Sequence, residues 1–247
     1  MKKIILGAAA AMAIAAPGTA LAQSGYAGLS YQSTDTSGSD IETTSLSGAA
    51  LLGEHFQLNG RFSSIESAGD GDAFDVDAFV FSRGAGGAFG GFVGFGSVDL
   101  GPSFDEWSVG AFGQWYSART TYTAQLGYSD TDGDIQVTHL DGEARHFVTD
   151  NFSLQGNIGL GQVEFSGSDG DYWSAGVGAE FQFSSAPVSI YGGWQHIDDD
   201  GGEFDTLGVG IRYNWGGTLF ERNRSGASMQ RATPTYFELL TGGDSPR

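Results

Sequence analysis

The sequence predicts an all-β protein: a transmembrane, antiparallel, up-and-down β-barrel of about twelve strands, preceded by a cleaved signal peptide. Three observations predict this fold class. Apolar and polar residues alternate along twelve segments, two kinds of connection alternate between those segments, and aromatic residues gather near segment ends. The expected organisation is a signal peptide at 1–22, a barrel at 23–215 and a tail at 216–247.

The first 22 residues have the features of a secretory signal peptide. Lys2 and Lys3 are followed by an apolar run over 4–16 and by the small-x-small pattern of residues 20–22. The run is shorter than the roughly 20 apolar residues of a transmembrane helix. We therefore expect export, with Gln23 as the first mature residue. Because the chain has no cysteine, disulfides cannot stabilise the exported fold.

Alternation with a period of two defines the expected strands. Most segments reach the about 9–11 residues that a tilted strand needs to cross a bilayer, and an even strand number is typical of bacterial barrels. The segments lie near 24–32, 42–52, 56–65, 73–82, 87–98, 106–116, 120–129, 135–148, 152–165, 172–183, 188–197 and 204–215.

The connections fall into two alternating classes, which predicts two different rims. Longer acidic loops are expected around 33–41, 67–72, 99–105, 130–134, 166–171 and 198–203. Tight turns are expected at 53–55, 83–86, 117–119, 149–151 and 184–187. In an antiparallel barrel all loops of one class meet at one end, as in outer-membrane barrels with long extracellular loops and short periplasmic turns.

Three hairpin registers support the alternation. Pairing Phe183 with Val188, Leu52 with Phe56, or Trp115 with Tyr122 places apolar residues on one face and polar or glycine residues on the other. Aromatic residues on the apolar face lie near strand ends, as expected for two interfacial girdles and not for a soluble core. These girdle residues are Trp107, Trp115, Tyr122, Tyr128, Trp173, Trp194, Tyr213 and Trp215.

The last expected strand carries a one-sided apolar pattern that ends in an aromatic residue. Its apolar positions are Leu207, Val209, Ile211, Tyr213 and Trp215. This strand resembles the closing strand of Gram-negative outer-membrane β-barrels, and the chain as a whole resembles their porin-like members. The resemblance implies an integral outer-membrane protein that contacts lipid and is inserted by the barrel-assembly machinery, which reads this strand as a signal.

The chain departs from that pattern after Trp215, because 32 residues follow it. This tail breaks the alternation and contains Arg222, Arg224, Arg231 and Arg247. We expect a periplasmic extension that is partly disordered. A docked plug or a partner-binding peptide is the alternative.

The barrel region is strongly acidic. Between residues 23 and 215 there are 27 Asp and Glu against 5 Arg, a net charge of −22, which excludes nucleic acid as a partner. With Val148 paired to Phe152, His139 also faces inward. Such charges either select ions in a channel or pair with one another as a structural network. The expected lumen-facing charges are Arg61, Asp75, Asp77, Asp141, Glu143, Arg145, Glu180 and Arg212.

Seven aspartates in the acidic loops are candidates for weak Ca²⁺ or Mg²⁺ binding at the extracellular rim. Asp-Gly clusters are equally ordinary turn chemistry, and the EF-hand pattern is not met. We expect no firm metal site and no cofactor. The seven are Asp70, Asp72, Asp130, Asp132, Asp134, Asp169 and Asp171.

Three functions follow as hypotheses. The first is a small, monomeric, cation-preferring channel for passive diffusion of small hydrophilic solutes or ions. The second is a non-channel structural or surface barrel with a salt-bridged lumen. The third is an outer-membrane lipid hydrolase, for which we assign no catalytic residues: His139 and Asp141 share a face without an adjacent serine, whereas Ser174 and His196 lie on opposite faces.

Overall fold

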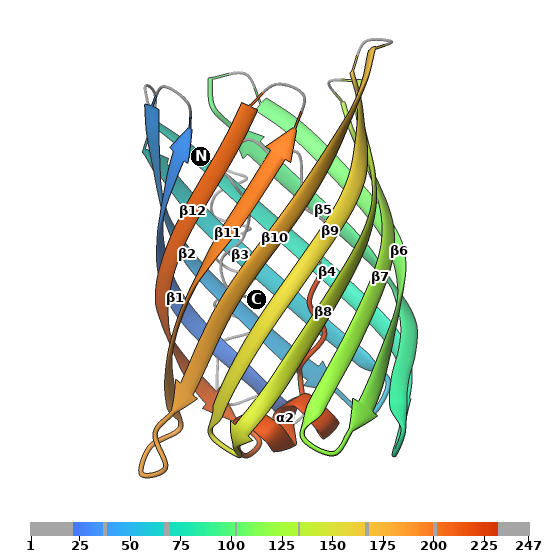
Figure 1. The fold of residues 1–247 in the computed structure, drawn as a ribbon, viewed down its shortest axis with the longest axis vertical. Coiled ribbons are helices and arrows are strands. Elements are labelled where there is room, and N and C mark those ends of the chain that lie inside the picture. Colours follow the sequence, from blue (N-terminus) through green and yellow to red (C-terminus); the bar gives the residue numbers. More distant parts are fainter. Residues whose placement is uncertain are drawn as a thin grey trace.

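The computed structural model describes residues 22–36, 39–66, 70–101, 103–132, 134–165, 168–199 and 202–231. They form a closed barrel in which each strand is antiparallel to its neighbours in chain order, and β1 pairs with β12 to close it (Figure 1). The predicted fold class and strand number are confirmed. The strands are β1 Ala22–Thr36, β2 Ser39–Leu52, β3 Phe56–Glu66, β4 Asp70–Gly84, β5 Gly87–Asp99, β6 Ser103–Ser117, β7 Thr120–Thr131, β8 Ile135–Thr149, β9 Phe152–Phe165, β10 Ser168–Gln182, β11 Val188–Asp199 and β12 Gly202–Trp215.

One helix, α2 (Leu219–Ser225), follows the barrel. Within the described residues, no helix has the length and apolar character needed to cross a membrane. The predicted signal peptide lies outside the described residues except for its last position, Ala22, so cleavage stays a prediction.

The strand registers follow from the alternation. The three predicted hairpin ladders have the expected partners, such as Phe181 with Ile190. In the fourth ladder, between β8 and β9, the observed pairs agree with the predicted register as far as Phe147 and Ser153. Phe152 then pairs with Thr149 and not with Val148 as predicted. Val148 is the extra residue of this β-bulge; Phe147 is still buried on the inner face and Val148 still exposed on the outer face, as the alternation predicts.

The outer face of the barrel is apolar. Leu207, Val209, Ile211 and Tyr213 are all at least 49% exposed, while Arg212 between them is 8% exposed. The predicted girdle aromatics also lie on the outer face, in two groups near opposite ends of the strands. Trp107 and Tyr128 form one close contact, with ring centroids 5.5 Å apart. An exposed apolar surface on this scale is typical of a face that contacts lipid or another protein.

The two rims differ in charge but not in the length of their connections, which corrects the prediction of long loops. At the acidic rim, formed by the connections 37–38, 67–69, 100–102, 132–134, 166–167 and 200–201, the strands continue to within two or three residues of each other. The opposite turn rim is formed by 53–55, 85–86, 118–119, 150–151 and 183–187. Many predicted loop carboxylates therefore lie on extended strand ends, because cross-strand pairing such as Asp35 with Asp40 satisfies their backbone groups.

Candidate functional site in the barrel lumen

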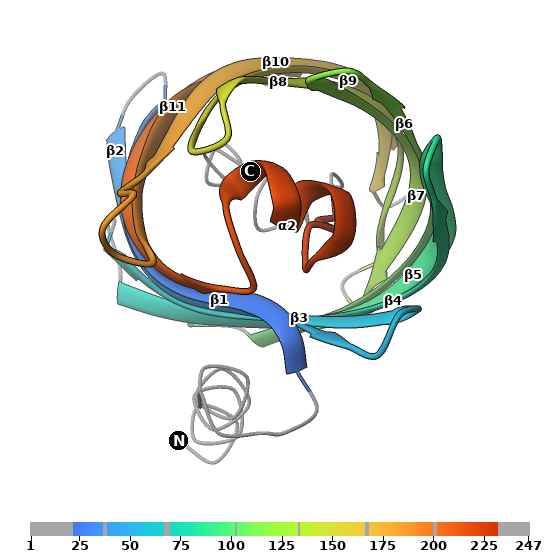
Figure 2. The same cartoon turned by 90° about the horizontal axis from the view of Figure 1, so that it is seen from below.

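The barrel lumen contains part of the protein's own C-terminal segment (Figure 2). Directly after β12, Gly216 and Gly217 adopt φ values of 94° and 112°, which favour glycine and turn the chain inward at the turn rim. Helix α2 begins there with a capping box, in which the Thr218 hydroxyl accepts from the Glu221 amide and the Glu221 carboxylate accepts from the Thr218 amide. The helix therefore has a well-defined start at the mouth of the barrel.

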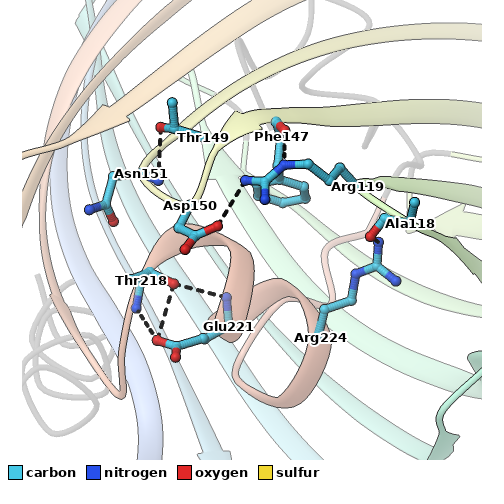
Figure 3. Close-up of polar contacts among 9 residues, drawn as sticks. All are labelled: Ala118, Arg119, Phe147, Thr149, Asp150, Asn151, Thr218, Glu221 and Arg224. Carbon is cyan, nitrogen blue, oxygen red and sulfur yellow. Dashed lines mark hydrogen bonds and ion pairs between the residues drawn. The ribbon is translucent and has the colours of Figure 1, made fainter.

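Helix α2 docks against the turns of this rim (Figure 3). The Phe220 ring packs edge-on against Phe147, with centroids 5.2 Å apart. Arg119 lies over Phe220 and donates to Asp150 at 2.8 Å. Arg224 donates to the Ser117 carbonyl at 3.2 Å. Aromatic packing and polar contacts thus fasten the helix to two turns of the barrel wall.

Arg222 points from α2 into the wall and is 6% exposed. Its Nη2 atom donates to the Gln182 side chain at 3.1 Å. Burial lowers the pKa of Arg222 to about 10, although the nearby Glu180 carboxylate acts in the opposite direction. The docked helix therefore places a guanidinium group in a strongly desolvated position.

Beyond the helix, residues 226–231 extend into the lumen. Arg83 donates to the Gly226 carbonyl at 2.9 Å. The Gln57 side chain accepts from the Met229 amide at 3.1 Å and donates to the Met229 carbonyl at 2.6 Å, and Asn59 donates to the same carbonyl at 2.9 Å. The Met229 side chain, 2% exposed, belongs to the apolar cluster at this end of the lumen, which also contains Phe79 and other inward aromatics.

Arg231 ends the described segment among three carboxylates, Asp75, Asp77 and Glu106, here called the acidic cage. Its Nε atom lies 3.3 Å from Asp77 Oδ1, its Nη1 atom 3.6 Å from Glu106 Oε1, and its Nη2 atom 4.0 Å from Asp75 Oδ1. The Nη1 atom also donates to the Ser108 hydroxyl at 2.8 Å. Each nitrogen of this buried guanidinium thus faces a different carboxylate.

The described part of the tail differs from the sequence-based expectation. Residues 216–231 dock within the barrel, as in the plug alternative, while the partial disorder expected of the whole tail stays a prediction. Their partners are distant in sequence, such as Gln57 for Met229, and so left no local pattern. One local signal was present, the capping-box spacing of Thr218 and Glu221. Residues 232–247 lie outside the described residues.

The structure places all eight predicted lumen charges on the inner face, and it brings most of them into pairs. Arg61 donates to Asp75 at 2.7 Å, Arg212 to Glu180 at 3.2 Å, and Arg145 lies 3.5 Å from Glu143. Asp141 hydrogen-bonds His139. Arg212 also stacks between the rings of Tyr26 and Tyr191, at 4.8 and 4.0 Å from their centroids. Sequence reasoning missed Glu106, which joins Asp75 and Asp77 at Arg231.

Small cavities lie between the tail and the lumen wall, two of which adjoin the charged residues described above. One of about 60 Å³ is lined by residues that include Arg61, Asp75 and Arg231. The other, of about 40 Å³, is lined by residues that include Asp141 and Gln230. Each of these cavities is large enough to hold water beside the docked segment.

The predicted cation loops gain no geometric support. Among the described residues, no three His, Asp or Glu side chains are grouped to hold a metal ion. Asp132 instead accepts from the Asp105 amide at 3.0 Å, and Asp169 accepts from Gln162 at 3.3 Å. Asp134 has a φ of 59°, a conformation that Asp adopts in turns.

The candidate catalytic groups do not form a triad order. His139 on β8 is level with Gly161 and Tyr172, whereas Ser174 on β10 is level with Asp141. Ser174 therefore lies across the sheet from Asp141, and His139 lies two residues further along β8. In a Ser-His-Asp triad the imidazole stands between the serine and the carboxylate, which is not the arrangement here. His196 lies on the outer face, where it stacks on Trp194.

Comparison with known proteins identifies proteins of similar fold but does not identify a family. No family model matches the sequence, and no curated protein matches it. Among solved structures, the NanC porin is similar with a TM-score of 0.59 at 10% identity, over 75% of this chain and 98% of that one. The KdgM porin has a TM-score of 0.57 at 8% identity, over 76% and 99%, and was also solved in complex with disordered oligogalacturonate.

The translocator domain of the autotransporter NalP from Neisseria meningitidis has a TM-score of 0.53 at 14% identity, over 85% of this chain and 95% of that one. At these identities the likeness concerns the fold. The chain thus has the fold of a porin-like outer-membrane β-barrel, with a C-terminal segment docked in its lumen.

Proposed function

We propose that this protein is an integral outer-membrane channel for passive diffusion of small hydrophilic solutes, with a preference for cations. The observation that carries the proposal is the division of the closed barrel into an apolar outer face and a charged inner face. A soluble barrel has a polar exterior, whereas a membrane barrel has an apolar one. A barrel whose interior side chains serve only its stability requires few charged residues inside. The likeness to the KdgM and NanC porins supports the same reading.

Cation preference follows from charge. The acidic rim gathers carboxylates at strand ends, and the barrel region carries 27 acidic residues against 5 arginines. A negative potential at one mouth raises the local concentration of cations and lowers that of anions. Inside the lumen, the carboxylates of the acidic cage contribute further negative charge.

The docked tail makes the present structure a closed state in this proposal. The segment 226–231 is bonded inside the lumen to Gln57 and Ser108, so in this proposal a continuous aqueous path requires the segment to leave its place. Conduction is therefore expected as intermittent openings and not as a permanently open pore.

Planar-bilayer recording of the full chain under a KCl gradient tests the function. We expect discrete conductance steps and a reversal potential on the cation-selective side. Asp77→Asn should shift the reversal potential toward zero, with the outward Thr138→Asn in β8 as control. The absence of steps, both in the natural chain and in a variant with a loosened tail, would eliminate the channel.

A second candidate is a structural barrel without transport, with its inner charges paired off. The bonds of Arg61 to Asp75 and of Arg212 to Glu180 favour it. In that case Arg212→Ala lowers the unfolding temperature, and no variant of the tail yields a current. The same recordings therefore separate the two candidates.

A further inference from the structure

The lumen contains a binding arrangement for one particular chemical group, a guanidinium. The three nitrogens of Arg231 lie within 4.0 Å of three different carboxylates, those of Asp77, Glu106 and Asp75. A guanidinium is planar and presents donors along three edges, whereas an ammonium is a compact point charge. Here three carboxylates surround the planar cation at ion-pair distances, and its Nη1 atom donates a hydrogen bond to the Ser108 hydroxyl.

The wall of the barrel is shaped around this group. Gly94 on β5 lies beside it: a Cβ atom at Gly94 would overlap Asp77 Oδ1 and Ser108 Oγ and would lie 3.0 Å from Arg231 Nη1. A side chain at this position would displace the groups that hold the guanidinium. The Ser108 hydroxyl adds a neutral acceptor at 2.8 Å from Nη1. Geometry and charge thus point independently to the same occupant.

Removal of Arg231 changes the charge balance of this region. Among Arg61, Arg231 and the acidic cage, two guanidinium groups accompany three carboxylates. Arg231, Asp77 and Glu106 are all at most 8% exposed. Because buried carboxylates require compensation, withdrawal of Arg231 is favourable only when another cation takes its place.

We propose that Asp75, Asp77, Glu106 and Ser108 form a guanidinium-binding site, that Arg231 fills it to hold the C-terminal segment in the lumen, and that small guanidinium solutes displace Arg231. This inference rests on the proposed channel function, because it names a solute class for the same lumen. Entry of the solute and release of the segment are then one exchange reaction.

Thiol labelling tests the exchange without any measurement of current. The natural chain has no cysteine, so Met229→Cys introduces a single buried thiol on the segment. Its reaction with a maleimide is measured in methylguanidinium chloride, methylammonium chloride and NaCl at equal ionic strength. We expect methylguanidinium alone to accelerate labelling, by roughly tenfold once it exceeds its dissociation constant about tenfold. Ser185→Cys, in an exposed turn, should label equally fast in all three salts.

Variants of the site sharpen the result. In the Met229→Cys background, Arg231→Gln should accelerate labelling on the order of tenfold to a hundredfold without any solute, because the ion pairs are lost. Methylguanidinium should then add nothing. Arg231→Lys keeps the charge without the planar geometry, so its labelling rate should lie between that of the Met229→Cys chain and that of the Arg231→Gln variant. Circular dichroism verifies folding, and if Arg231→Gln does not fold, Ser108→Ala supplies a milder loosening of the same contact.

Two outcomes overturn the site. Equal acceleration by methylammonium and methylguanidinium would show a general salt effect, and unchanged labelling in folded Arg231→Gln and Ser108→Ala variants would show that the contact does not hold the segment. Failure of the channel is a separate result. If labelling responds as expected but no variant conducts, the guanidinium site is supported and the channel function is contradicted. If currents appear but methylguanidinium does not change the labelling rate, the channel function is supported and the guanidinium site is contradicted.

Discussion

Arg61 and Asp75 face each other directly across the β3–β4 ladder, and the Nε atom of the arginine donates to Oδ2 of the carboxylate at 2.7 Å. Both side chains are largely buried, with 12% and 15% exposed. This pair joins the barrel wall to the acidic cage, since Asp75 also faces Arg231.

Arg61→Ala is expected to destabilise the barrel by about 2 kcal/mol, because it leaves a buried carboxylate with less compensation. The measurement is thermal unfolding in detergent. Asp150→Asn is the matched control: its carboxylate pairs with Arg119, the two side chains are 61% and 41% exposed, and the ion pair contributes less than about 1 kcal/mol. Equal losses in both variants would contradict the assignment of Arg61 to a buried network.

Ile158→Arg tests the lipid-facing surface. Ile158 lies in the middle of β9 and is 69% exposed. On the surface of a soluble protein this change is nearly neutral, whereas at the depth of a bilayer it costs about 2–4 kcal/mol. Unfolding measured in lipid vesicles should show that loss, while Ser185→Arg in the exposed turn should show none. Full stability of Ile158→Arg in vesicles would argue against a membrane-embedded barrel.

Gly94→Ala tests the shape of the guanidinium site without a change of charge. The new Cβ would overlap Asp77 and Ser108, so the segment should be held less tightly by roughly 1–3 kcal/mol. The labelling rate of the thiol introduced by Met229→Cys measures the effect. Gly142→Ala on β8 is the control, because its nearest contact would be Ile158 at an ordinary 3.9 Å.

Thr218→Ala removes the capping-box hydroxyl at the start of α2 and should weaken the docked helix by about 1 kcal/mol. The same labelling assay should therefore show about a fivefold acceleration, since roughly 1.4 kcal/mol corresponds to tenfold. Ser184→Ala, in the exposed turn, should leave the rate unchanged. No change for Thr218→Ala would mean that the hold on the segment does not depend on the helix.

The sequence predicted the barrel well because a β-barrel is encoded by local alternation. The two-residue period alone placed Arg61, Asp75, Glu180 and Arg212 inside, and tight turns fixed the hairpin registers. The bulge at Val148 escaped because one extra residue leaves the overall pattern intact. The acidic connections were overestimated because Asp and Gly are poor strand formers, yet pairing with a neighbour keeps them extended.

The lumen site was only half visible for a different physical reason. Its wall residues, such as Asp77, lie on strands whose alternation shows which side chains face inward. The segment that fills the site is instead held by contacts to backbone atoms and by pairs more than 100 residues apart in the sequence. Gln57 binds the amide and carbonyl of Met229 and would accept many other residues there. Such contacts impose no residue type and leave no signature in the sequence.

Ser24 connects three parts of the molecule that are far apart in the chain. Its hydroxyl donates to the Trp215 carbonyl at 3.3 Å and accepts from the Ala227 amide at 3.2 Å. The seam that turns the sheet into a cylinder and the anchorage of the inner segment therefore share one atom. Closure of the sheet by β1 and β12 and docking of the inner segment therefore stabilise one another through this hydroxyl.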